Sequence, residues 1–71
     1  MIEVGNLVQF CGNYLIKDKD KTKIEMNLNP RRGIVIDVID LFISVLSDNE
    51  ICILSFQDKD VCLVEIIDSD K

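Results

Sequence analysis

The stretch from Arg32 to Ser47, RGIVIDVIDLFISVLS, constrains the fold of this 71-residue chain more than any other part of it. It is rich in β-branched side chains, which crowd the preceding turn of a helix and fit well on a pleated strand. Asp37 and Ser44 interrupt the apolar run at positions that set a period of two. The stretch therefore predicts two neighbouring β-strands that fold back on each other.

The same period predicts which side chains of these two strands form the core, because alternate residues of a strand share a face. The connection around Asp40 lacks the Asn-Gly or Asp-Gly pair of a tight hairpin, so the register stays open by one residue. The predicted core residues are Ile34, Ile36 and Val38 in the first strand, with Ile43 and Val45 in the second.

Apolar side chains also occupy the opposite face of these strands, and a small sheet cannot bury both of its faces unaided. A long hairpin earlier in the chain could cover part of this second face, and the rest would then form an interface with a partner protein. The candidate interface residues are Val35, Ile39, Phe42 and Leu46.

Length and composition predict one small domain over residues 1–71, which buries only about 60% of the surface of its unfolded chain. Hydrophobic residues make up 48% of the sequence, which favours a globular chain over a disordered one. No apolar run reaches the roughly 18 residues of a membrane helix, and the N-terminus lacks a basic segment before an apolar one. We therefore expect neither membrane insertion nor export by a signal peptide.

Histidine is absent, and Cys11, Cys52 and Cys62 show no C-x-x-C spacing. This residue set predicts no metal site, no cofactor and no catalytic residue, because neither a histidine base nor a cue for cysteine activation is present. Three cysteines without a pairing pattern are typical of a reducing compartment, with the thiols as small buried hydrophobes. The sequence favours a protein that is not an enzyme.

Charge is unevenly distributed along the chain, whose net charge is −5. Residues 14–32 carry six basic and three acidic side chains, whereas residues 33–71 carry two basic and nine acidic ones. The chain as a whole should repel nucleic acid, so only the segment 14–32 offers a local basic surface. The candidate basic contacts are Lys17, Lys19, Lys21, Lys23, Arg31 and Arg32.

The remaining segments complete an all-β pattern. A first strand is predicted over residues 4–10, and the polar segment 11–30 that follows is expected to form a long loop or protruding hairpin. A fourth strand is predicted over about 51–56 and a closing strand over 64–67. If 51–56 paired with 61–66 across Asp58-Lys59, Cys62 would lie opposite Ser55, and a disulfide between Cys52 and Cys62 would be disfavoured. Five short strands with turns at this spacing predict a small antiparallel barrel.

Four short motifs resemble one known family: VGNLVQF at 4–10, GIVIDV at 33–38, ISVL at 43–46 and VEII at 64–67. Together they are similar to the small SH3-like barrel proteins encoded by tailed bacteriophages, which open with Val-Gly-Asp-Leu-Val. The chain departs from that pattern at Asn6, which replaces the Asp, and at Ser47, where such proteins often have Trp. The missing Trp argues against a peptide groove or methyl-lysine cage, which are built from clustered aromatic rings.

The resemblance implies a non-enzymatic virion component of the head, neck or tail. Such a component would be located in the virion or the host cytoplasm. It would pack against a larger virion protein or against copies of itself as a homo-oligomer. The alternative is an intracellular adaptor that binds nucleic acid, or an enzyme acting on nucleic acid, through the basic segment 14–32.

Overall fold

The computed structural model describes residues 2–57 and 61–68, and its regular elements are five antiparallel strands in one sheet. This confirms the predicted all-β class. The strands are β1 (Leu7–Asp18), β2 (Lys21–Ile39), β3 (Phe42–Ser47), β4 (Glu50–Ser55) and β5 (Cys62–Asp68).

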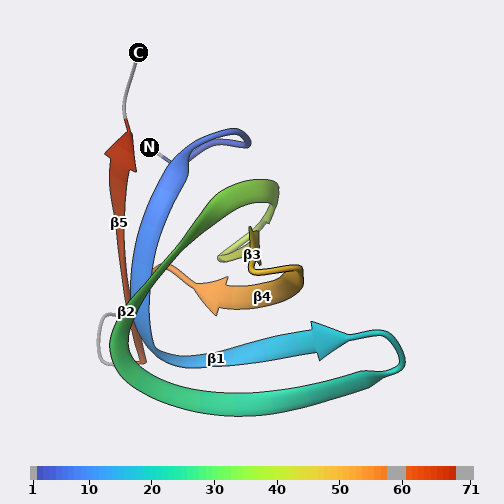
Figure 1. Cartoon of the computed structure of the whole chain (residues 1–71). Coiled ribbons are helices and arrows are strands. Elements are labelled where there is room, and N and C mark those ends of the chain that lie inside the picture. Colours follow the sequence, from blue (N-terminus) through green and yellow to red (C-terminus); the bar gives the residue numbers. More distant parts are fainter. Residues whose placement is uncertain (1, 58–60, 69–71) are drawn as a thin grey trace.

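Strands β1 and β2 form the long hairpin that the sequence predicted for the polar segment. Gly12 to Asp18 pair with Asn27 to Lys21, and Lys19 takes a positive φ of 55° at the tip. The two strands then continue side by side, so that Leu7 pairs with Ile34. Figure 1 shows them as two long ribbons that bend together through the molecule. The hairpin arms are thus part of the sheet and do not cover it.

The order of the strands is β2-β3-β4-β1-β5, with a further pairing between β2 and β1. The first four strands therefore form a closed circuit of pairings, and β5 lies beside the first half of β1 (Figure 1). The conditional pairing of 51–56 with 61–66 does not form among the described residues. The first half of β1 pairs with β5 and its second half with β4, so these two strands never become neighbours.

A corner in β1 at Gly12 separates its two halves. Gly12 is the last β1 residue that pairs with β5, opposite Cys62, and pairing with β4 begins at Leu15. Gly12 has a φ of +118°, and the pairing of β1 with β2 shifts register between Phe10 and Gly12. Pro30, which has no N–H to donate, lies in the part of β2 that this shift leaves unpaired.

The core lies between the curved halves of the sheet and confirms the buried positions predicted for Ile43 and Val45. The prediction was wrong for Ile34, Ile36 and Val38, all of which are exposed. The buried apolar side chains are Val8, Phe10, Tyr14, Ile16, Val35, Ile43, Val45, Cys52, Leu54 and Cys62.

Register explains the error in β2. Val35 pairs directly with buried Val45, so it shares the inner face, and a one-residue slip moves its neighbours to the other face. A bulge between Val35 and Asp37 then inserts Ile36 without a partner, after which Val38 pairs with Ile43 at the partly open end of the core. Simple alternation across the whole of GIVIDV therefore fails at Ile36.

Two tight turns join β2, β3 and β4. Ile39 pairs with Phe42, leaving a two-residue turn in which Asp40 has a φ of 53°. Ser47 pairs with Glu50, and Asp48 and Asn49 between them both have positive φ, as in a type I′ turn. Asp and Asn tolerate this left-handed conformation better than other non-glycine residues, so Asp40 closes a hairpin without an Asn-Gly pair.

All three cysteines are free. Cys52 and Cys62 are buried in the core, as expected for small hydrophobes, and Cys11 is half-buried. Burial raises the pKa of Cys52, and burial together with nearby Cys11 raises the pKa of Cys62 to about 11. Both shifts make the folded chain hold thiol protons more tightly than the unfolded chain does.

We expect the free energy of unfolding to fall at alkaline pH for this reason. A raised folded pKa gives stability that is complete below the unfolded thiol pKa, near 9.0, and is lost as pH rises through about 11. For Cys62 the loss amounts to about 2 to 3 kcal/mol at about 1.4 kcal/mol for each pKa unit. Urea unfolding at pH 7.5 and 10.5 measures it, and Cys62→Ala should show a smaller difference between the two pH values. An equal difference in both proteins would contradict this assignment.

Candidate protein-binding surface

The face of the sheet opposite the core carries a surface of exposed apolar side chains. Across β2, β3 and β4, Ile34 pairs with Leu46, and Leu46 pairs with Ile51. Ile39 pairs with Phe42 in the same way near the Asp40 turn. Side chains of directly paired residues lie on the same face, so these two rows, with the row of Asp37, Ser44 and Ile53 between them, form a mainly apolar patch.

Three of the four candidate interface residues lie on this patch, since Ile39, Phe42 and Leu46 are all exposed. Val35 does not belong to it: its exposed fraction is 0%, because its pairing with Val45 turns it into the core. Ile34 takes its place, as the outward neighbour of Leu46. The predicted interface thus needs one correction, and it has the same cause as the error in the core.

A second group of apolar residues on this face was missed by the sequence analysis. Ile24, Met26 and Leu28, on the N-terminal half of β2, have exposed fractions of 76%, 67% and 71%, the highest among the exposed large hydrophobic side chains of the described residues. The alternation I-E-M-N-L-N was the available signal, since it predicts a strand with one apolar face. The usual burial pattern is reversed in this strand: the polar residues Glu25 and Asn27 are half-buried, and the apolar residues between and beside them are exposed.

Shallow hollows connect the two groups. One is lined by Leu15, Ile24, Phe42, Ile53 and Val61, so it joins β1 and β2 to β3 and β4. The next is lined by Met26, Leu28, Val61 and Leu63, among others. We call the whole surface the outer apolar face. Its members are Leu15, Ile24, Met26, Leu28, Ile34, Ile39, Phe42, Leu46, Ile51, Ile53, Val61 and Leu63.

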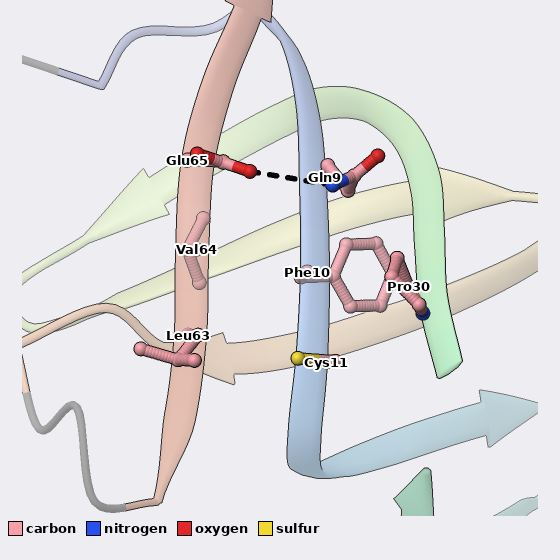
Figure 2. A pocket seen from close by; sticks show the side chains of 7 residues that line it. All are labelled: Gln9, Phe10, Cys11, Pro30, Leu63, Val64 and Glu65. Atoms are coloured by element: carbon pink, nitrogen blue, oxygen red, sulfur yellow. Dashed lines mark hydrogen bonds between the residues drawn. The ribbon is translucent and has the colours of Figure 1, made fainter. Parts of the chain in front are cut away.

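A larger pocket of about 410 Å³ borders this face between β1, β5 and Pro30. Figure 2 shows the Phe10 ring beside Pro30, with Leu63 and Cys11 at one end. At the other end Gln9 Nε2 donates a hydrogen bond of 3.2 Å to Glu65 Oε1. An apolar floor with a polar rim can accept an apolar side chain of a protein partner, and Leu63 is common to this pocket and the outer apolar face.

The predicted basic contacts separate into two groups. Lys17, Lys19, Lys21 and Lys23 are all exposed at the hairpin end, with Asp18 and Asp20 between them. Arg32 is also exposed, and its Nε donates to Gln9 Oε1 at 3.1 Å. Arg31 is not available as a phosphate contact, because its side chain is only 14% exposed and is already occupied. This corrects the prediction for Arg31.

Arg31 instead holds the turn between β3 and β4 against β2. Its Nε donates to Ser47 Oγ at 2.9 Å, and its Nη2 donates to the Ser47 carbonyl at 2.8 Å and to Glu50 Oε1 at 2.7 Å. Buried Ser47 in turn donates from Oγ to the Arg32 carbonyl at 2.6 Å. Burial alone would lower the pKa of Arg31, but the hydrogen bond with Glu50 helps to raise it above its ordinary value. Arg31 therefore has a structural role.

Within residues 2–57 and 61–68, no three acidic or cysteine side chains are grouped so that they could hold a metal ion. That part of the chain also lacks any helix of the length and apolarity needed to cross a membrane. Comparisons with protein-family models, with curated proteins and with solved structures found no match.

Proposed function

We propose that this chain is a non-enzymatic structural protein that acts by packing against other protein surfaces. The outer apolar face is the observation that supports this proposal. It joins side chains from all five strands and the β4–β5 connection, and many of its members are exposed large hydrophobics. Large apolar side chains that several strands expose on one face are typical of a protein contact.

The outer apolar face includes several large exposed side chains, among them Phe42, Leu46 and Met26. Burying one of them against a partner contributes roughly 1.5 to 3 kcal/mol, before the costs of association are subtracted. Phe42, Leu46 and Met26 on one surface would therefore supply several kcal/mol towards a complex. Binding of this kind depends on apolar burial and requires no catalytic group.

We further propose that the sheet is an SH3-like barrel and that the protein is a small virion component of a tailed phage. The closed circuit of pairings through β2, β3, β4 and β1 supports the barrel. The motifs VGNLVQF, GIVIDV, ISVL and VEII support the phage assignment by resemblance. The partner would then be a larger head, neck or tail protein, or further copies of this chain.

Mass spectrometry tests this assignment directly. Purified phage particles and the infected cells that produce them are digested, and peptides of this chain are quantified in both. The proposal expects the chain in the particles at a fixed ratio to a known capsid or tail protein. Its presence in infected cells together with its absence from purified particles would refute the virion role.

The adaptor that binds nucleic acid is the second candidate, and the exposed lysines at the hairpin end favour it. Two aspartates alternate with the four lysines there, and Arg31 adds no free positive charge to this surface because it binds Glu50. We expect no specific oligonucleotide binding, because the chain as a whole carries a net charge of −5. Fluorescence anisotropy with single- and double-stranded oligonucleotides at low salt measures this. Affinity that falls steeply with salt and is lost in Lys19→Glu/Lys21→Glu would favour the adaptor instead.

A further inference from the structure

The N-terminal half of β2 forms a free edge of the sheet. Residues Lys21 to Asn27 pair with β1 on one side and with no other described strand. The opposite side of this segment therefore presents backbone N–H and C=O groups that can pair with a further strand. We call residues 21–28 the edge segment.

The side chains of the edge segment are sorted by face in a way that suits pairing. Ile24, Met26 and Leu28 lie on the outer apolar face, and Lys23 and Glu25 lie on the opposite face, where they pair with Ile16 and Tyr14 of β1. A strand added to this edge must present apolar residues to one face and polar residues to the other. A one-residue slip would place apolar beside polar side chains on both faces.

The edge segment meets this requirement with its own sequence. In an antiparallel pair of two copies with Ile24 on the two-fold axis, Lys23 of each copy lies opposite Glu25 of the other. Two opposite-charge pairs then flank two facing Ile24 side chains, and Thr22 lies opposite Met26. With Glu25 on the axis, two carboxylates would face each other, which is unfavourable.

We propose that a second copy of this chain adds its edge segment antiparallel to this one, forming a two-fold symmetric dimer with a continuous sheet. The inference rests on the proposed packing function and names one of its partners. It uses strand addition at a sheet edge, in which backbone hydrogen bonds supply affinity and side chains supply register. It also brings two outer apolar faces together into one larger surface.

The edge segment contains two lysines, Lys21 and Lys23. Lysine on an edge strand commonly prevents pairing with other chains, because it places like charges side by side. Here Glu25, two residues from Lys23, supplies the opposite charge when the copies pair around Ile24. The charges of Lys23 and Glu25 therefore favour the register centred on Ile24 over the register centred on Glu25.

Charge exchange tests the dimer. The wild-type chain should show a concentration-dependent dimer in sedimentation velocity, and Lys23→Glu or Glu25→Lys alone should raise its dissociation constant about tenfold or more. The double variant Lys23→Glu/Glu25→Lys should restore the dimer, and so should mixing the two single variants. Lys19→Glu, which makes the same charge change at the hairpin tip, is the matched control and should leave the dissociation constant within about twofold at moderate salt.

Cysteine cross-linking tests the register in a Cys11→Ser background. Ile24→Cys should form a disulfide between copies under mild oxidation, and Met26→Cys should not, because Met26 faces Thr22 of the second copy. A monomeric wild-type chain, failure of the charge exchange to restore association, or preferential cross-linking at position 26 would each overturn the proposal. These results are independent of the particle measurement: a chain found in virions but monomeric in solution refutes the dimer alone.

Discussion

Replacing Arg31 with alanine is expected to lower the free energy of unfolding by about 2 to 3 kcal/mol, because it removes several charge-assisted hydrogen bonds from a partly buried network. The change removes the 2.7 Å partner of the Glu50 carboxylate and the guanidinium donors to Ser47 Oγ and to the Ser47 carbonyl. For a domain of this size the loss corresponds to a fall in Tm of roughly 15 °C. Thermal melting followed by circular dichroism measures it.

Two controls show whether the hydrogen-bond geometry of Arg31 matters or only its charge. Arg31→Lys keeps the charge but lacks the fork that reaches Ser47 and Glu50 together, so it should still be destabilised. Arg32→Ala removes an exposed neighbour and should change the free energy of unfolding by only about 0.5 kcal/mol. Equal losses for Arg31→Ala and Arg32→Ala would show that the network around Ser47 does not stabilise the turn.

Gly12→Ala is expected to have a comparable effect, about 2 to 4 kcal/mol, from backbone strain and steric overlap together. A Cβ at this position would lie 2.5 Å from the Val61 carbonyl oxygen and 2.9 Å from Cys62 Cα. Both are backbone atoms, so β5 would have to move away from β1. The φ of +118° adds strain for any residue with a Cβ. Urea unfolding measures the total loss.

Gly5→Ala is the matched control for this prediction. Gly5 also has a positive φ, of 99°, but a Cβ there would meet no atom within 4 Å. It should therefore show the backbone strain without the overlap, which leaves a cost of about 1 kcal/mol. If the two alanine variants lose equal stability, close packing of β5 against the corner of β1 is not what the structure requires at Gly12.

Sequence patterns predicted the strands better than the faces of those strands. The β-branched residues between Gly33 and Val45 were sufficient to predict two strands, and Ile43 and Val45 are buried as expected. The burial of Val35 could not be predicted by counting alternate residues, because the bulge at Ile36 changes the count. Bulges depend on pairing between distant segments, so local periodicity does not reveal them.

The sequence predicted one part of the outer apolar face and missed another. Phe42 and Leu46 followed from simple alternation within β3, which contains no bulge. Ile24 and Met26 show an equally clear alternation, but they lie within the polar segment 11–30, for which the sequence predicts only a long loop or protruding hairpin. That strand exposes its apolar side, which no rule based on burial would predict. We propose that these side chains are exposed because they contribute to contacts with a partner protein.

The most direct test of the outer apolar face replaces Phe42 and Leu46 with serine and measures how much of the chain purified particles retain. We predict that Phe42→Ser/Leu46→Ser melts within a few degrees of the wild-type Tm, since both side chains are exposed. Val45→Ser, one strand position away in the core, should unfold. Quantitative mass spectrometry of particles made with the double variant should find at least about tenfold less chain than with wild type. A folded double variant present in particles at the wild-type amount would contradict the account.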